Sequence, residues 1–297
     1  MTPREQGFLL LTSQLGAPER KPMTVAQFRT LTHRARTMEK PVQDRDMRPG
    51  DLVAIGYSED QAQRILQLLS ERELLEYYLG KARRAGCAAL TRVSTEYPAR
   101  VRKALGQDSP GCLWAKGDIA LLDTPCVALV GSRELRPENR EFARELGRQA
   151  ARQGYTLVSG NARGADKEAQ QACLDAGGCV ISVVADRLDA HRATDRKLYL
   201  SEDSFDMGFS AQRALSRNRI IHSLGTKTFV AQATLERGGT WDGTMRNLRL
   251  GLSSVFCFRD GSRAAAALEQ MGAVPVTVQA LEDISALKSE QIDIFGR

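Results

Sequence analysis

Several residue types that mark other classes of protein are scarce or badly spaced in this sequence. Only 6% of the 297 residues are aromatic, the six cysteines form no C-x-x-C pair, and the three histidines lie far apart. The apolar run Cys179 to Ala185 covers about a third of the ~20 residues that a membrane helix needs. The run Phe8 to Leu11 is too short for a signal peptide. We therefore expect a soluble, cytoplasmic protein with reduced cysteines and with neither a metal site nor a cofactor.

Arginine, in contrast, is abundant. Lys and Arg together number 42 against 36 Asp and Glu, a net charge of +6, and 33 of the 42 cations are Arg. Because guanidinium groups pair with phosphates and stack on bases, this bias favours a nucleic-acid or nucleotide partner; codon bias in a GC-rich genome would produce the same excess. Some of the arginines recur every four residues among glutamates, which predicts a solvated, partly salt-paired helix face. These are Arg136, Arg140, Arg144, Arg148 and Arg152.

The N-terminal part of the chain has the sequence pattern of helices. Short apolar patterns with a helical period occupy residues 1–85, and the segment from Pro41 to Pro49 interrupts them. Ser58 is a suitable N-cap for the apolar-periodic run that continues to Leu79. We expect residues 1–85 to form a small helical domain of the helix-hairpin or SAM-like kind, with a role in packing or in binding, and residues 86–297 to form a second domain.

From Cys126 onward, short apolar runs alternate with helical periods. Strands that are apolar on both faces and alternate with helices are typical of a parallel sheet covered on both sides. The expected fold class is therefore α/β, with a Rossmann-like, doubly wound, mostly parallel sheet. Ligands bind such sheets at the carboxyl ends of the strands. The predicted strands are 126–130, 156–158, 179–185, 227–233, 254–258 and 274–278, and the predicted helices include 138–153, 165–176 and 244–250.

Four short motifs fall near the predicted strand ends. G-S-R occupies residues 131–133, S-G-N-A-R-G-A-D residues 159–166, R-N-R residues 217–219 and G-G-T residues 238–240. Glycines let the backbone approach a phosphate, and helix starts present free N–H groups to anions. None of the motifs is a G-x-G-x-x-G or Walker sequence, which disfavours a dehydrogenase or a P-loop ATPase. Taken singly, each motif is equally well explained as an ordinary turn between a strand and a helix.

As a set, in this order and spacing, the four motifs resemble the DNA-processing protein A (DprA/Smf) family. The run from Asp108 to Asp118, preceded by Tyr97-Pro98, is similar to the segment that precedes the Rossmann-like domain in that family. The resemblance covers roughly residues 86–260 and only loosely the helical N-terminus. It implies binding of single-stranded DNA, a role in DNA processing and recombination, and a homodimer formed through the Rossmann-like domain.

The chain departs from the family pattern at several positions. The resemblance therefore favours single-stranded DNA binding over the loading of a recombinase. Phage defence and a toxin–antitoxin pair are alternative roles. The protein partner would be a recombinase or a toxin. We expect no counterpart of the winged-helix domain that ends many members of the family. The substituted positions are Ala165 for Ile, Gln170 for His, Asp195 for Asn, Gln232 for Glu and Phe258-Arg259-Asp260 for V-P-G.

A groove for single-stranded nucleic acid needs cations along its length and planes on which bases stack. Few rings are present, so we expect phosphate-dominated, sequence-tolerant binding with stacking on Phe205 or Phe209. Because Arg217 and Arg219 lie two apart on a predicted helix, at least one should project outward. The residues expected to line the groove at the carboxyl ends of the strands are Gly131, Ser132, Arg133, Ser159, Gly160, Asn161, Arg163, Gly164, Arg196, Lys197, Arg217, Asn218, Arg219, Gly239 and Thr240.

Two other functions compete with this interpretation. The first is a nucleotide phosphoribohydrolase (an N-glycosidase) of the lysine decarboxylase-like type, whose signature is P-G-G-x-G-T-x-x-E. Here G-G-T-W-D-G-T at residues 238–244 has the wrong spacing, and Asn247 or Leu248 stands where the glutamate belongs. Asp166 is the one carboxylate in the motifs suited to hydrolysis, and it serves equally well as a helix cap. The second is a nucleotide-sensing or protein-binding module. We expect a binding protein rather than an enzyme.

Overall fold

The computed structural model describes residues 1–38, 47–202 and 204–289. The chain divides into two compact units. Unit 1 comprises Met1–Tyr97 and Pro110–Leu113, and unit 2 comprises Pro98–Ser109 and Trp114–Arg297. The predicted domain boundary after residue 85 stays a prediction.

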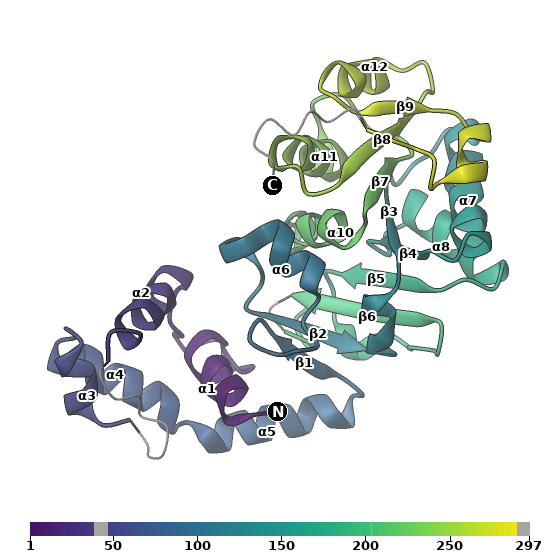
Figure 1. The fold of residues 1–297 in the computed structure, drawn as a ribbon. Coiled ribbons are helices and arrows are strands. Elements are labelled where there is room, and N and C mark those ends of the chain that lie inside the picture. Colours follow the sequence, from purple (N-terminus) through teal and green to yellow (C-terminus); the bar gives the residue numbers. More distant parts are fainter. Residues whose placement is uncertain (39–46, 203, 290–297) are drawn as a thin grey trace. The chain divides into compact units, whose positions relative to one another are not determined.

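Unit 1 is mainly helical (Figure 1). Three of its helices begin with capping boxes, in which a Thr or Ser hydroxyl accepts a hydrogen bond from the backbone three residues on. Ser58 is one of these caps, as predicted. The predicted run to Leu79 is in fact two helices that meet at Glu71. The helices are α1 (Pro3–Thr12), α2 (Val25–Ala35), α3 (Pro49–Ala54), α4 (Glu59–Ser70) and α5 (Arg72–Arg84).

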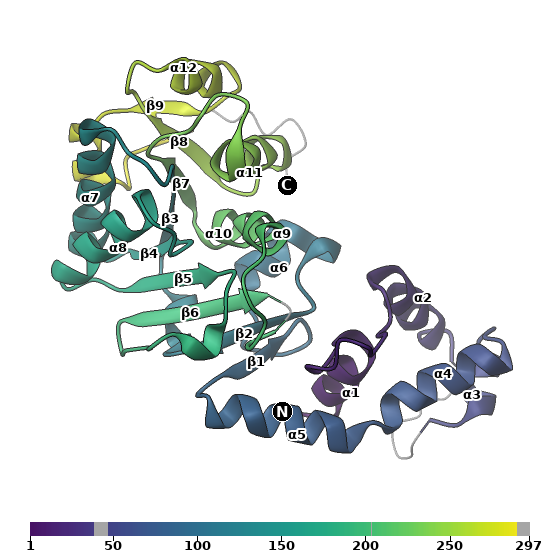
Figure 2. The same ribbon diagram turned by 180° about the vertical axis from the view of Figure 1, so that it is seen from behind.

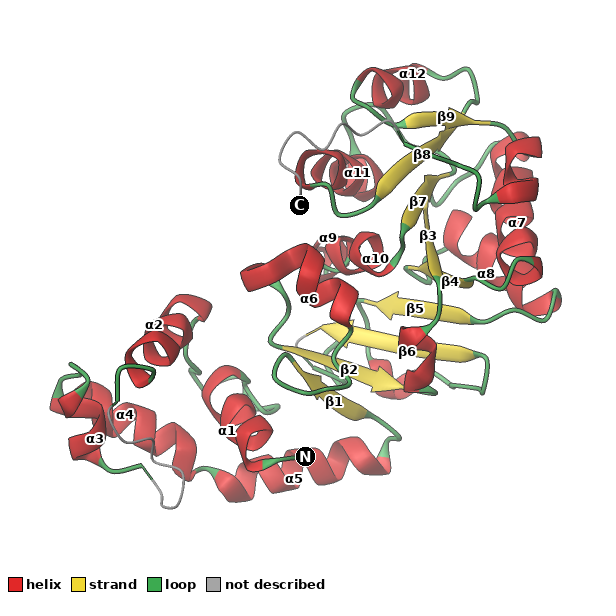
Figure 3. Ribbon diagram, in the orientation of Figure 1, coloured by secondary structure: helices red, strands yellow, loops and turns green. Residues whose placement is uncertain are grey.

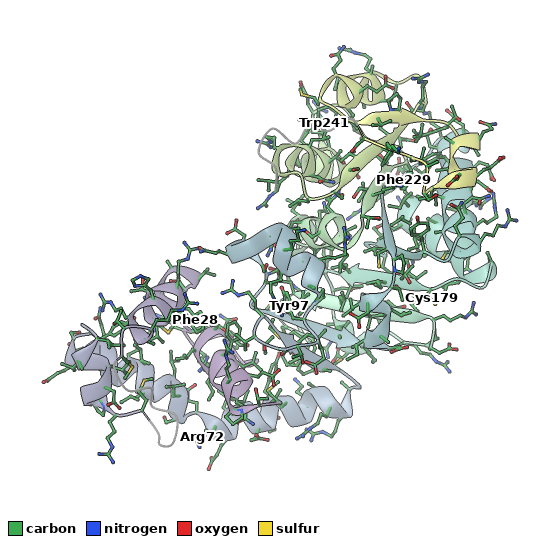
Figure 4. All side chains as sticks on the ribbon, viewed as in Figure 1. Phe28, Arg72, Tyr97, Cys179, Phe229 and Trp241 are labelled. Atoms are coloured by element: carbon green, nitrogen blue, oxygen red, sulfur yellow. The ribbon has the colours of Figure 1, made fainter. Side chains whose placement is uncertain are left out.

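Unit 1 has its own hydrophobic core. Leu52 of α3 is fully buried and packs with apolar residues of α1, α2 and α4. Phe28, labelled in Figure 4, meets Phe8 edge to face with ring centres 5.0 Å apart. Most of the break predicted between Pro41 and Pro49 lies outside the described residues, and α3 begins at Pro49. The buried members of this core are Leu11, Leu31, Leu52, Ala62, Ile65 and Leu68.

Nine strands form one sheet in the order β1-β2-β6-β5-β4-β3-β7-β8-β9. Every recorded strand pair from β3 to β9 is parallel. The chain winds outward from β3 through β4, β5 and β6, and then returns to the other side of β3 with β7, β8 and β9. The predicted doubly wound, mostly parallel α/β fold is thereby confirmed. The strands are β1 (Ala88–Thr91), β2 (Cys112–Lys116), β3 (Cys126–Val130), β4 (Thr156–Ser159), β5 (Val180–Val184), β6 (Lys197–Glu202), β7 (Lys227–Val230), β8 (Ser254–Phe258) and β9 (Val274–Val276).

Helices cover both faces of the sheet in unit 2. Figures 1 and 2 show α7 and α8 on one face and α6, α10 and α11 on the other. On the first face, Phe142 and Leu146 of α7 pack against Phe229, labelled in Figure 4, and Phe256. Full burial of each such side chain contributes roughly 1.5–3 kcal/mol. These helices are α6 (Ala99–Leu105), α7 (Pro137–Arg152), α8 (Ala165–Asp175), α9 (Ala211–Ser216), α10 (Asn218–Leu224), α11 (Gly238–Leu250) and α12 (Arg263–Gln270).

The structure corrects three local predictions (Figure 3). Strand β6 was not predicted, because Lys197–Glu202 mixes polar and apolar residues. The G-G-T motif at residues 238–240 forms the first turn of α11 rather than a loop. The predicted helix through R-N-R breaks at Arg217, where α9 ends and α10 begins.

All six cysteines are free, and five of them are buried. Among the residues that the structure describes, none of the helices combines the length and hydropathy needed to cross a lipid bilayer.

Candidate nucleic-acid interface

A cavity of about 440 Å³ opens where β3, β4 and β5 end. Its walls come from the loops that follow these three strands and from the segment between β6 and α10. This is the edge of the sheet at which the sequence predicted a ligand. We call it the Arg217 cavity; it is lined by Arg133, Gly160, Asn161, Ala162, Arg163, Val184, Ala185, Asp186, Phe209 and Arg217.

Arg217 is the buried cation of this cavity. Its side chain is withdrawn from solvent at the junction of α9 and α10, with 9% of the residue exposed. The guanidinium lies against Gly160, where a Cβ atom would come within 1.5 Å of Nη1, so a larger residue there would displace the guanidinium. Burial lowers the pKa of Arg217, and the charge of Asp166 opposes that effect. Among the described residues, Arg217 Nε has no hydrogen-bond partner.

Asp166, in the first turn of α8, supplies the countercharge. Its Oδ2 accepts a hydrogen bond from Ala162 N at 3.0 Å, and the backbone of Gly160 donates a second. Burial raises the pKa of this carboxyl, while Arg217 and the two backbone amides act in the opposite direction. The amides of this loop therefore hold Asp166 instead of forming the free phosphate cradle that the glycine spacing suggested.

Two further arginines lie at the mouth of the cavity. Arg133 follows β3 and is exposed. Arg163 has 74% of its side chain exposed and forms an ion pair of 3.3 Å with Glu134, which is 89% exposed. An ion pair between two such exposed groups is weak. The cavity thus combines two exposed cations with one buried cation.

Asp186 lines the cavity but was not among the predicted residues. It follows Ala185 in a loop that the strand pattern assigned to the site, and its Oδ1 lies 2.8 Å from His191 Nε2. Phe209 also lines the cavity and is 61% exposed, so its ring is available for stacking. Phe205 is fully buried with its ring 5.0 Å from that of Trp114, so the prediction that it stacks on bases is wrong.

Some predicted residues shape the loops rather than face the cavity. The backbone N and the hydroxyl of Ser132 both donate to Gln232 O. Ser159 is fully buried, and its hydroxyl accepts a 2.5 Å hydrogen bond from Gln170. The two glutamines are positions at which the chain departs from the family pattern, and each bonds inside unit 2. Gly131 and Gly164 permit close packing, since a Cβ atom there would lie 2.4 Å from Ala165 Cβ or Arg133 O, respectively.

Asn218 and Arg219 lie at a different pocket, of about 330 Å³, beside α11. Asn218 Nδ2 donates to Gly239 O at 2.9 Å, within the first turn that also contains Thr240. Arg219 pairs with Glu202, with 12% of each side chain exposed, and donates to Asp108 O at 2.7 Å. Neither arginine of the R-N-R motif projects freely outward. That prediction is wrong because the helix breaks at Arg217, which leaves Arg217 near buried Asp166 and Arg219 paired with half-buried Glu202.

Arg196 and Lys197 lie at the opposite edge of the sheet. Lys197 is the first residue of β6 and pairs in parallel register with Val180, the first residue of β5. Arg196 Nη1 donates to Leu174 O at 2.9 Å. The prediction that these two cations line the carboxyl-end groove is therefore wrong, because the unpredicted strand β6 places them at its amino end. Within the described part of the chain, no cluster of three or more His, Cys, Asp or Glu residues is suited to a metal ion.

Comparisons with known proteins agree with this fold. The profile of a family described as DNA recombination-mediator protein A matches residues 88–277. Protein Smf of Escherichia coli is 31% identical over 142 residues, 44% of this chain and 38% of that protein. DNA processing protein DprA of Streptococcus pneumoniae is 32% identical over 141 residues, 44% of this chain and 50% of that protein. The match thus spans half or less of the length of these relatives.

Solved structures show the same fold. The crystal structure of Streptococcus pneumoniae DprA superposes with a TM-score of 0.64 at 24% identity, covering 86% of this chain and 96% of that one. Helicobacter pylori DNA processing protein A, whose structure addresses its single-stranded DNA binding mode, gives a TM-score of 0.55 at 24% identity, covering 66% of this chain and 94% of that one. Since the family profile covers well over half of the sequence, this chain belongs to the DNA recombination-mediator protein A (DprA/Smf) family.

Proposed function

We propose that the protein binds single-stranded DNA at the Arg217 cavity, as a mediator of DNA processing and recombination. The observation that carries this proposal is the buried Arg217 guanidinium, which lines the cavity and has an unpartnered Nε. A buried N–H donor without a partner is unfavourable even where a countercharge is near, so an anionic group that accepts a hydrogen bond from Nε is favoured. A phosphate of the DNA backbone supplies that group.

The volume and charge of the cavity suit a nucleotide unit of a strand. Its 440 Å³ lies within the roughly 300–1,000 Å³ of typical ligand pockets. Three arginines line it, and Phe209 offers the exposed ring on which a base can stack. Such contacts recognise phosphates and ring faces rather than base edges, so binding is expected to tolerate any sequence. The direct contacts that we propose are Arg133, Gly160, Asn161, Arg163, Phe209 and Arg217.

The biological setting follows from the family. We propose a cytoplasmic homodimer formed through the Rossmann-like unit, which passes single-stranded DNA to a recombinase. The family description and the DNA-binding relative from Helicobacter pylori support recombination over phage defence or a toxin–antitoxin role. In this proposal the protein acts by binding, without catalysing a reaction.

One observation favours a second candidate function, the hydrolysis of a nucleotide N-glycosidic bond. Asp186 places a carboxylate, hydrogen-bonded to His191, beside the cavity, and such hydrolysis needs a carboxylate near the scissile bond. Incubation with nucleoside monophosphates, followed by chromatography, separates the two candidates. If free base is released and the Asp186→Ala variant releases none, the hydrolytic function replaces the binding function. If the nucleotides stay intact, the binding function is retained.

The binding proposal is tested by fluorescence anisotropy with labelled oligo-dT. Binding in the micromolar range or tighter is expected at about 50 mM salt, with a steep loss toward about 200 mM as phosphate contacts are screened. Replacing Arg133 by Ala removes a charge at the cavity mouth. We expect affinity to fall about tenfold and the salt slope to shrink by roughly 0.7, the value for one phosphate contact on a single strand.

Arg144 provides the matched control. It carries the same charge on the exposed face of α7, where its Nε lies 2.7 Å from Glu168 Oε2. Arg144→Ala should change DNA affinity by less than about twofold. Equal weakening by the two substitutions in folded proteins would mean that a diffuse cationic surface, not the Arg217 cavity, binds the strand. Absence of binding by the unmodified protein at low salt would refute the proposed function itself.

A further inference from the structure

Unit 1 contains a cleft of its own, of about 190 Å³. One wall is α2, and the other is α4 with the Tyr57 turn that precedes it. The floor is apolar and includes Ile65 and Leu68, whereas the rim is polar and cationic. We call it the Arg34–Arg64 cleft; its lining residues are Met23, Gln27, Thr30, Arg34, Tyr57, Gln61, Arg64, Ile65 and Leu68.

The charge of the cleft has one sign. Arg34 Nη1 donates to Gly56 O at 2.6 Å, and its guanidinium carbon lies 4.5 Å from the centre of the Tyr57 ring. Arg64 Nη2 donates to Lys21 O at 2.9 Å. These bonds hold each guanidinium in place while its other N–H groups can still bind a ligand. None of the nine described lining residues is acidic, so the cleft is complementary to an anionic ligand.

Tyr57 adds a polar group inside the cleft. Its hydroxyl is buried and has no hydrogen-bond partner among the described residues. A buried hydroxyl without a partner is unfavourable, so a ligand that hydrogen-bonds to it is bound more tightly. The neighbouring Arg34–Tyr57 stack presents a flat cation of the kind on which nucleobases stack.

We propose that the Arg34–Arg64 cleft binds one unstacked base of a single-stranded DNA, with the flanking phosphates on Arg34 and Arg64. The volume is below that of a typical ligand pocket, so it suits one ring rather than a whole nucleotide. Bases of a duplex are paired and stacked and cannot enter, which selects single strands. This site is distinct from the Arg217 cavity, and it gives unit 1 a direct part in holding the ligand that the proposed function assigns to unit 2.

The test uses the full chain and oligo-dT of about 30 nucleotides in the anisotropy assay. The double variant Arg34→Ala/Arg64→Ala removes both phosphate contacts. Its affinity is expected to fall about tenfold or more, and its salt slope to shrink by roughly 1.4, twice the value for one contact. The matched control is Arg83→Ala/Arg84→Ala, which removes two exposed charges from α5 of the same unit, outside the cleft. Circular dichroism verifies that both variants are folded.

A second variant separates base binding from simple charge attraction. Tyr57→Phe keeps the ring and the charge of the cleft but removes the hydroxyl. It should weaken binding of oligo-dT about threefold or more and leave binding of an abasic strand unchanged. Equal losses on both strands would overturn the base-binding part of the proposal.

The outcomes distinguish this proposal from the proposed function. Suppose that Arg133→Ala weakens DNA binding, while the Arg34/Arg64 variant binds DNA as tightly as its Arg83/Arg84 control. The proposed function of the Arg217 cavity is then supported, and the proposal for the cleft is refuted. If the unmodified protein binds no single-stranded DNA, the proposed function and the cleft proposal are both refuted. If a glutamate-rich peptide binds in a manner that depends on Arg34 and Arg64 while DNA binding does not, the cleft is a peptide site and the proposal is refuted.

Discussion

At the scale of single residues, Arg217 and Gly160 are in close contact in the wall of the Arg217 cavity. The absence of a side chain at Gly160 leaves room for the guanidinium, which occupies the position of a Cβ atom. The same guanidinium is paired electrostatically with buried Asp166, which in turn holds the loop through Ala162 N. Cation, carboxylate and loop are therefore one interdependent arrangement, and a change in any of them should affect DNA binding.

Replacing Gly160 by Ala tests this dependence. The new methyl group would lie 1.5 Å from Nη1, so the guanidinium must move out of its position. We expect DNA affinity to fall about tenfold, comparable to the loss of one charge-assisted contact, as measured by anisotropy. Gly208→Ala is the control, since nothing lies within 4 Å of its Cβ position. Unchanged binding by Gly160→Ala would show that Arg217 does not act from this position.

At the scale of secondary-structure elements, a buried histidine joins α10 to α11 and β7. His222 Nδ1 lies 3.1 Å from Asn247 Nδ2, and Asn247 Oδ1 accepts from Ser253 N at 3.0 Å. The second bond fixes the orientation of the Asn247 amide, so Nδ2 donates to Nδ1 and the proton of the neutral ring is on Nε2. Burial lowers the pKa of His222 to about 4. The ring is neutral in the folded protein at neutral pH.

This histidine predicts a loss of stability in acid. Its pKa is lower in the folded state than the usual 6.5, so the unfolded chain binds the proton more tightly. The free energy of unfolding should fall as the pH drops below about 6.5, by up to about 3 kcal/mol as the pH approaches 4. Urea denaturation at several pH values measures this. His222→Gln should lack this part of the pH dependence; an unaltered pH profile in that variant would contradict the assignment.

The elements that were predicted correctly are those with a uniform environment. Strands such as β3 and β5 are buried on both faces and read as continuous apolar runs. In contrast, β6 begins with Lys197 and ends with Ser201 and Glu202, so it does not read as an apolar run, and α11 begins with two glycines, which disfavour helix in any local pattern. The errors in the site follow from these omissions. Arg219 finds its partner, Glu202, on the strand that was not predicted.

The loops of the candidate site were predictable for a different reason. In a parallel sheet the carboxyl ends of adjacent strands meet at one edge, so the loops after β3, β4 and β5 had to converge. Arg133, Arg163 and Arg217 are brought together there as expected. Which side chain is buried and which is solvated depends on tertiary packing, and no spacing in the sequence contains that information.

At the scale of the whole molecule, the net charge of +6 is what remains after 36 acidic residues offset 42 basic ones, and part of that offset is local. On α7, Arg140 and Arg144 pair with Glu168, and Arg148 pairs with Glu141 and Glu145. These pairs bear out the partly salt-paired stripe predicted from the sequence. Arg140, Arg144 and Arg148 are thereby neutralised locally and should contribute little to the attraction of an anionic strand.

The core of α1 to α4 in unit 1 and the core between α7, α8 and the sheet in unit 2 consist of different residues, which predicts separable unfolding. Leu52 is fully buried in the core of unit 1, and Leu52→Ala should destabilise that unit by about 2–5 kcal/mol. Both tryptophans, Trp114 and Trp241, belong to unit 2. In urea, far-UV circular dichroism should show an earlier helical transition in the variant, while the tryptophan fluorescence keeps the midpoint of the unmodified protein. A joint shift of both signals would show that the units unfold as one.

The burial of Arg217 also has a kinetic consequence. Its guanidinium is dehydrated and fixed before any ligand arrives, so little of the protein has to become ordered when a strand enters. The solvated Arg133 and Arg163 attract the strand from a distance and are screened by salt. Under the proposed function, we therefore expect Arg133 and Arg163 to determine how fast a strand is captured and Arg217 to determine how long it stays bound. Raising the ionic strength should slow capture far more than it shortens the residence time of a strand already bound.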